Sequence, residues 1–192
     1  AVRTVLDFAG LPIYMLINAI SVRSVLREAR VIIMGQAVIA LVLRRLPRRQ
    51  LSEPQKALLY DSLQYIAVSK RDFHENHYVL TRLLLTHFGI PVEPKHPLPD
   101  DYLTRLSHAP PGIADICKLV ILLGFILDGH VSFRERFKLH DLNRLGILLE
   151  SFADMKRYAR EFLAGAGVAA WSEPFLMRID TSWPRDTVAG ND

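Results

Sequence analysis

The chain has 192 residues, of which 50% are hydrophobic and 23% are charged, and its formal net charge is +4. This balance is typical of a folded protein with one domain, or one domain and an extension, and it excludes a disordered tail or linker. The single cysteine, Cys117, excludes an intrachain disulfide and favours a reducing compartment, and its apolar neighbours predict a buried, unreactive thiol.

Residues 1–50 hold most of the positive charge and two apolar stretches. Eight arginines lie here against two acidic residues, so this segment carries +6 and the rest of the chain −2. The uncharged stretches 8–22 and 31–43 are each shorter than the roughly 18 to 20 residues that span a bilayer, and a span joining them would bury the charges of residues 23–30. No small-residue cleavage site follows the first stretch, so a cleavable signal peptide is not expected.

Two interpretations of residues 1–50 stay open. The favoured one makes them further core helices of a bundle, because a helix that is apolar all round is more often buried in protein. The other makes them a membrane-surface element whose arginines contact anionic lipid. The candidates for that contact are Arg44, Arg45, Arg48 and Arg49. Nucleic acid is not expected as a partner, since these arginines are not interleaved with aromatic residues and no recognition-helix motif accompanies them.

Two helices are predicted next, with candidate metal ligands at the break between them. Ser52 begins a capping box, Ser-Glu-Pro-Gln, that predicts a helix to about residue 69, and a second helix is predicted over 73–88. His74 and His77 lie one helical turn apart with Asp72 beside them, and these residue types can hold zinc or iron. The spacing is not that of His-Glu-x-x-His, so we favour solvated or capping histidines.

Prolines and apolar runs mark the elements that follow. Four prolines within residues 89–99 predict an extended connector, and residues 113–127, apolar on nearly every face, predict a central helix. The remaining helices are predicted over residues 100–107, 132–148 and 151–163. Residues 164–192 have no helical period and predict an irregular tail, whose two tryptophans favour equally a strap packed on the bundle and an arm that binds a partner.

The most specific motif is Asp-Gly-His-Val-Ser-Phe-Arg-Glu at residues 128–135, which matches the second half of an EF-hand loop. Side chains without oxygen stand where the first ligands belong, so the loop supplies about three of the six or more oxygens that a hard cation needs. We favour a structural interpretation in which Ser132 caps the next helix and Glu135 completes a capping box. Weak binding of a divalent cation by Asp128 and Glu135 is the alternative.

The helix-break-helix pattern occurs twice. Residues 58–77 align with residues 116–135 at a constant offset of 58, which pairs Lys70 with Asp128. The chain as a whole is therefore predicted to be an all-α helical bundle with two tandem helix-loop-helix units and an additional apolar N-terminal helical segment. Its predicted parts are the N-terminal segment 1–50, a tandem helical domain 51–163 and the tail 164–192.

Over about residues 53–163, the two hairpins and their acidic break resemble the tellurite-resistance TerB-like family and the N-terminal domain of the DjlA membrane co-chaperones. The resemblance implies a compact all-helical domain without established catalysis, work near a membrane or in stress responses, and divalent-cation binding by acidic loop residues. Asp128 and Glu135 carry over, with Asp72 as a weaker third. Lys70 and His77 stand where the second unit has Asp128 and Glu135, which argues against a metal site in the first unit.

The expected function is a non-enzymatic binding or scaffolding module near a membrane, with a protein partner. Its expected location is the cytoplasm, either free or peripheral at the inner face of the membrane. The alternative is a metal-dependent enzyme that uses the residues Asp72, His74, His77, Asp128 and Glu135. The chain has no Gly-rich phosphate loop, Ser/His/Asp signature or dinucleotide-binding fingerprint, which favours the non-enzymatic interpretation.

Overall fold

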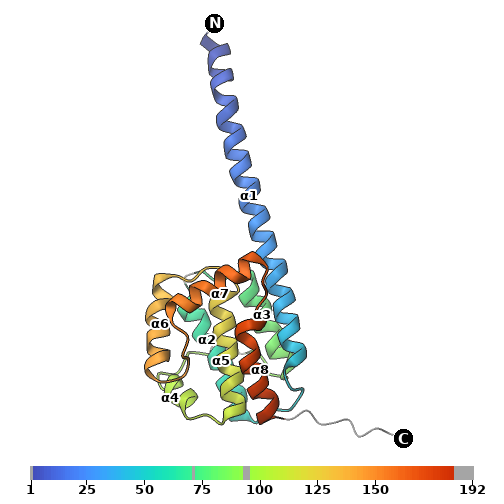
Figure 1. Ribbon diagram of the computed structural model, residues 1–192, viewed down its shortest axis with the longest axis vertical. Coiled ribbons are helices and arrows are strands. Elements are labelled where there is room, and N and C mark those ends of the chain that lie inside the picture. The colour runs from blue at the N-terminus through green and yellow to red at the C-terminus, as the bar shows by residue number, and fades with distance from the viewer. Residues whose placement is uncertain (1, 71, 93–95, 184–192) are drawn as a thin grey trace, which may run out of the picture.

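Helices form all the regular structure in the described part of the chain. The computed structural model describes residues 2–70, 72–92 and 96–183, with side chains from residue 14 onward, and these residues form eight helices and no strand. Figure 1 shows a bundle from which the first helix rises. The all-α class is thereby confirmed, whereas the division into two tandem units stays a prediction.

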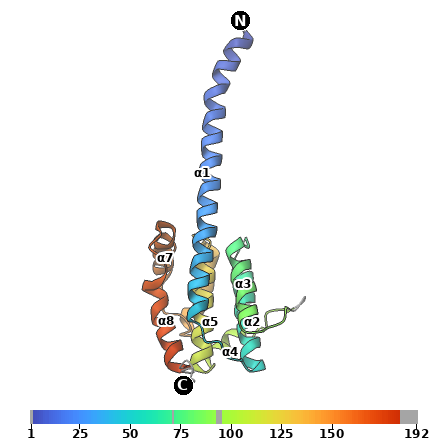
Figure 2. The same ribbon diagram turned by 90° about the vertical axis from the view of Figure 1, so that its right-hand side faces the viewer.

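The N-terminal helix α1 runs without a break over Val2–Arg45, although two separate helices were expected. Good helix formers connect the two apolar stretches, and Pro47 ends the helix because proline cannot continue it. The second stretch packs into the core, where Val31, Ile39 and Val42 are buried. Residues 14–30 project from the bundle with every side chain exposed (Figures 1 and 2). Residues 31–43 therefore contribute one face to the core, whereas residues 14–22 lie outside it, against the core prediction. Residues 8–13 lie outside the described side chains.

Helix α5, Pro111–Ile126, is the centre of the bundle, as its apolar sequence predicts. Every residue of α5 except Pro111 and Lys118 is buried. It packs against α2, Glu53–Ser69, and against α4, Tyr102–Ser107. Gly124 permits the close approach to α2, because a Cβ atom there would lie 2.5 Å from the side chain of Ile66.

Helix α3, Glu75–His87, joins α1 to the rest of the bundle. It packs against α1, and Asn76 at its start donates hydrogen bonds to the backbone oxygens of Val31 (3.0 Å) and Leu127 (2.7 Å). Gly35 of α1 lies against the same asparagine, and a Cβ atom there would overlap the Asn76 side chain. The buried side-chain amide of Asn76 therefore connects the start of α3 to α1 and to the end of α5.

Helices α6 (Phe133–Arg144), α7 (Phe152–Ala164) and α8 (Ala169–Ser182) complete the bundle. The presence of α8 corrects the prediction of an irregular tail over residues 169–182. Its buried residues Trp171, Phe175 and Ile179 follow one another at intervals of four and pack against α5. Pro174 lies inside the helix and obscures that period in the sequence. The strap interpretation is confirmed for this segment, while residues 184–192 lie outside the described ones.

Candidate functional site

The break between α5 and α6 has the capping box that the sequence predicts. The backbone N–H of Ser132 donates to Glu135 Oε2 at 2.6 Å, and the backbone N–H of Glu135 donates to Ser132 Oγ at 3.4 Å. Gly129 turns the chain with φ +69°, in the left-handed region, and a Cβ atom there would also lie 2.5 Å from Leu163. The loop is therefore closed by its own side chains and backbone.

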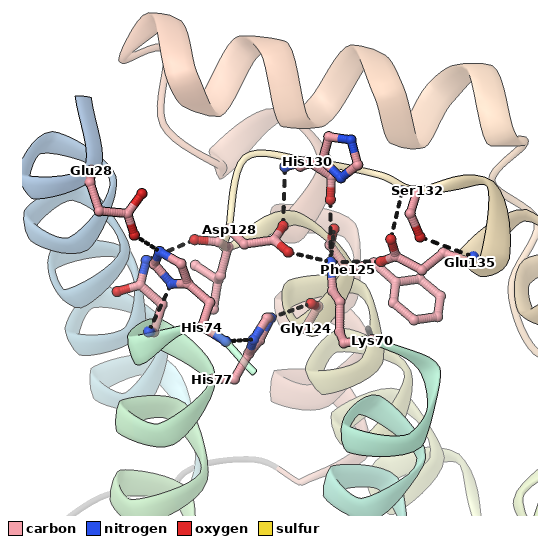
Figure 3. Close-up of polar contacts among 12 residues, drawn as sticks. Glu28, Lys70, His74, His77, Gly124, Phe125, Asp128, His130, Ser132 and Glu135 are labelled. Carbon is pink, nitrogen blue, oxygen red and sulfur yellow. Dashed lines mark hydrogen bonds and ion pairs between the residues drawn. The ribbon is translucent and has the colours of Figure 1, made fainter. Parts of the chain in front are cut away.

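A buried ammonium group occupies the centre of this loop (Figure 3). Lys70 Nζ, from the end of α2, lies 2.8 Å from Asp128 Oδ2 and 2.6 Å from Glu135 Oε1. It also donates to the backbone oxygens of Phe125 (3.1 Å) and His130 (3.2 Å). In an EF-hand, loop carboxylates and backbone oxygens surround a metal ion. Here four such oxygens surround the cation that Lys70 supplies.

Burial makes this ion pair structurally important. The side chains of Lys70 and Glu135 are 3% and 2% exposed, whereas that of Asp128 is 16% exposed. Glu135 Oε1 has no partner among the described residues other than Lys70 Nζ, and that contact has the geometry of an ion pair rather than of a hydrogen bond. Removing either charge from such a pair leaves the other desolvated and uncompensated, at a cost of about 3 to 5 kcal/mol.

The two predicted histidine ligands lie together at the start of α3, with their ring centroids 6.1 Å apart. His74 Nδ1 accepts from the backbone N–H of Asn76 (3.0 Å), and His74 Nε2 contacts Glu28 Oε1 (2.7 Å). His77 Nδ1 accepts from the backbone N–H of His74 (3.1 Å), and its Nε2 contacts the backbone oxygen of Gly124 (2.7 Å). All four ring nitrogens are therefore engaged, and the capping interpretation describes both histidines.

These contacts hold His77 in its neutral form. Burial is the main reason why its pKa is lowered to about 4, and the nearby Lys70 charge lowers it further, against the opposing effects of Asp128 and the Gly124 carbonyl. The hydrogen bonds also favour the neutral form of His77. Its Nδ1 accepts from the backbone N–H of His74, and a proton on Nδ1 would point at that N–H. Protonation of His77 therefore opposes folding.

The predicted metal ligands Asp128, Glu135, His74 and His77 thus contact other groups of the protein instead of all pointing at a common centre. Lys70 forms ion pairs with both Asp128 and Glu135, the two histidines bind backbone groups and Glu28, and Asp72 is exposed. Among the residues that the structure describes, no three His, Cys, Asp or Glu side chains are grouped so that they could hold a metal ion. Metal binding stays a prediction, and a cation entering the loop would have to displace the Lys70 ammonium group.

The four arginines predicted to contact a membrane do not act as one group. Arg45 binds Glu173 (3.1 Å) and Asp180 (3.3 Å) and so clamps α8 onto α1. The other three, Arg44, Arg48 and Arg49, are exposed. All four lie at or just beyond the C-terminal end of α1, remote from its projecting apolar residues, because Arg44 is roughly 33 Å from Val22 at 1.5 Å per residue.

The projecting part of α1 is the feature that sequence reasoning missed. Within the described part of the chain, no helix combines the length and hydropathy needed to cross a bilayer. Residues 23–30 contain neither Gly nor Pro, and this is the signal that could have joined the two apolar stretches into one helix. A signal for the internal cation also existed, since the repeat alignment pairs Lys70 with Asp128.

Comparison with known proteins adds no relative. No protein-family model matches the chain, and no curated protein or solved structure is significantly similar to it. The resemblance to the TerB-like family therefore rests on the quoted residues alone.

Proposed function

We propose that this chain is a non-enzymatic binding module that the projecting part of α1, residues 14–30, holds at a membrane. One observation carries the proposal: every side chain in this range is exposed, and many are large and apolar. The apolar ones are Tyr14, Met15, Leu16, Ile17, Ile20, Val22, Val25 and Leu26, all more than half exposed. Exposed apolar surface on this scale marks an interaction site.

The distribution of these residues favours lipid over a protein groove as the covering material. Positions 14–17 are consecutive, and successive residues of an α-helix point about 100° apart, so apolar side chains surround the helix. A coiled-coil or groove partner needs one apolar stripe, whereas lipid can cover all sides. A helix satisfies its own backbone hydrogen bonds, so it can enter an apolar layer without exposing polar backbone groups.

The charges next to this apolar part fit a membrane surface. Arg23, Arg27 and Arg30 follow it directly, and all three are exposed. Near anionic lipid, each such arginine adds roughly 1 kcal/mol of attraction. The only acidic residue among them, Glu28, is held by His74 at 2.7 Å. These three arginines, rather than Arg44, Arg48 and Arg49, are placed to contact headgroups when the apolar part enters the membrane.

The rest of the bundle supports binding rather than catalysis. The ring nitrogens of His74 and His77 and the carboxylates of Asp128 and Glu135 already have partners within the fold. In this proposal the bundle presents a surface to a partner protein close to the membrane, and the resemblance to the TerB-like family favours a role in stress responses.

Flotation with lipid vesicles tests the proposal on the full chain. Replacing Leu16, Ile17 and Ile20 with Gln should abolish flotation, because it removes apolar area without breaking the helix. A matched variant, Ile33→Gln with Leu41→Gln, changes exposed apolar residues of α1 at the level of the bundle and should float like the natural protein. If the natural protein floats with neither anionic nor neutral vesicles, the proposal is refuted. Dimerisation through residues 14–26 would then explain the exposed surface.

A second pair of variants tests the place of contact. Replacing Arg23, Arg27 and Arg30 with Gln should weaken flotation with anionic vesicles and reduce its dependence on salt. Replacing Arg44, Arg48 and Arg49 with Gln removes the same charge from the far end of α1 and should have little effect. The opposite ranking would show that the membrane contacts the base of the bundle.

A further inference from the structure

A large groove lies between α2 and α3 on the bundle. Its walls come from α2, which packs against α5, from α3, which packs against α1, and from residues 89–92. Its volume is about 690 Å³. Its walls are mostly apolar, and two of its aromatic side chains, Phe73 and Tyr78, are 51% and 57% exposed.

A second, basic hollow adjoins one end of the groove. Its volume is about 630 Å³, and it shares Thr86 and Gly89 with the apolar groove. The cations that line it are Arg48, Arg49 and Lys56, and none of its lining residues within the described part of the chain is acidic. The two hollows therefore meet at Thr86 and Gly89, with the apolar groove on one side and the basic hollow on the other.

The spacing of residues along α2 accounts for this arrangement. Lys56, Tyr60, Gln64 and Ala67 follow at intervals of four, four and three, so they lie along one face of the helix. Lys56 lies at the basic end and Ala67 at the apolar end. The distance between them along the helix axis is roughly 16 Å at 1.5 Å per residue.

The basic end has unused binding capacity. Within the described residues, Arg48 and Arg49 form no ion pair and no side-chain hydrogen bond, and both are exposed. Lys56 binds Glu53 at 2.7 Å, but the Glu53 side chain is 85% exposed, so this pair is weak. Two guanidinium groups and an ammonium group in one hollow suit an oxyanion, because guanidinium binds phosphate and carboxylate through paired hydrogen bonds.

We propose that this groove binds an amphiphile with one hydrocarbon chain and an anionic phosphate or carboxylate head. The chain lies between α2 and α3, where it covers the exposed faces of Phe73 and Tyr78. The head binds Arg48, Arg49 and Lys56. The proposal does not depend on contact between α1 and a membrane, since α1 does not line the apolar groove.

Titration of the full chain with octyl, decyl and dodecyl phosphate, each below its micelle-forming concentration, tests the proposal. Isothermal calorimetry should show Kd falling about fourfold for each added methylene, which corresponds to about 0.8 kcal/mol. Inorganic phosphate should bind far more weakly than decyl phosphate, and so should decyl glucoside, which has the same chain and no charge.

Two variants separate the head site from the chain site. Arg48→Gln with Arg49→Gln should weaken decyl phosphate binding at least tenfold and leave decyl glucoside binding unchanged. Ala67→Phe, which fills the groove at its apolar end, should weaken both ligands. Arg44→Gln removes an exposed charge outside the site and serves as the control for unspecific electrostatics. Unchanged melting temperatures and circular dichroism spectra establish that the variants are folded.

Several results would overturn the proposal. A Kd that does not depend on chain length, or inorganic phosphate that binds as tightly as decyl phosphate, would leave a simple anion site. Equal losses from Arg44→Gln and from Arg48→Gln with Arg49→Gln would leave only general attraction to a basic chain. Binding that occurs only when the ligand is in vesicles would assign the arginines to a membrane surface instead.

Discussion

Replacing Lys70 with Met tests whether the buried ammonium group holds the α5–α6 loop together. Methionine has a similar length and volume, so the substitution removes the charge while leaving little cavity. It leaves Asp128 and Glu135 without their shared cation, and the backbone oxygens of Phe125 and His130 without a donor.

The structure indicates a large effect. Because the side chains of Lys70 and Glu135 are 3% and 2% exposed, water cannot take over the role of the lost partner. We expect the free energy of unfolding to fall by about 3 to 5 kcal/mol, the range for breaking a buried pair. For a chain of this size, that loss lowers Tm by roughly 6 to 20 °C. The exposed lysine Lys156 provides the control, since Lys156→Met should cost less than about 1 kcal/mol.

Urea denaturation of a double variant separates charge from packing. Adding Glu135→Gln to Lys70→Met should restore about 2 kcal/mol near pH 7, because glutamine removes the charge and still completes the capping box. A loss below about 1 kcal/mol for Lys70→Met, or a double variant that is no more stable than Lys70→Met, would refute the electrostatic reasoning.

Four further predictions concern other parts of the bundle. The pKa of His77 is lowered to about 4, from a value near 6.5 in the unfolded chain, so the unfolded chain binds a proton first as the pH falls. The free energy of unfolding should therefore fall by about 3 kcal/mol between pH 6.5 and pH 4. Urea titrations should show this loss, and His77→Gln should remove most of it. Burial raises the pKa of the Cys117 thiol to about 12, so the folded protein should not react with a thiol reagent near pH 8, where the unfolded chain reacts at once. Gly35→Ala should destabilise the protein by about 1 to 3 kcal/mol in the same urea assay, because the added methyl group overlaps Asn76; an unchanged midpoint would show that α1 and α3 can separate freely. Calcium at about 1 mM should leave Tm unchanged because Lys70 occupies the loop centre, and a rise in Tm that Glu135→Gln abolishes would instead establish a cation site.

Local signals predicted much of the bundle correctly. Capping boxes depend on residues three apart in the sequence, so the boxes that begin at Ser52 and Ser132 could be read directly from the chain. The apolar run of residues 113–127 likewise predicted the central helix, since a helix that is apolar on nearly every face must be covered all round.

Features that depend on distant partners could not be predicted in the same way. Ile20 and Ile39 are both isoleucines in apolar stretches of α1, yet Ile20 is 60% exposed and Ile39 is fully buried, because only the second lies where α3 packs. The contact of Lys70 with Glu135 joins residues far apart in the chain, and the repeat alignment pairs Lys70 with Asp128 rather than with Glu135. In α8, the buried residues do follow a helical period. Pro174 and the glycines before the helix nevertheless favoured an irregular segment, because both residue types are typical of breaks in helices.

The uninterrupted course of α1 determines how the bundle is oriented as well as where it is attached. A flexible linker would let the bundle sample all directions around its attachment point, whereas a helix acts as a semi-rigid spacer of about 1.5 Å per residue. The same helix that projects from the bundle is locked into it by the contact between Gly35 and Asn76 and by the Arg45 ion pairs. When residues 14–22 are held, the α2–α3 face of the bundle must therefore keep a constant orientation relative to that anchor point. Residues 23–30 set the distance between the apolar residues and the bundle at roughly 12 Å, the length of eight helical residues.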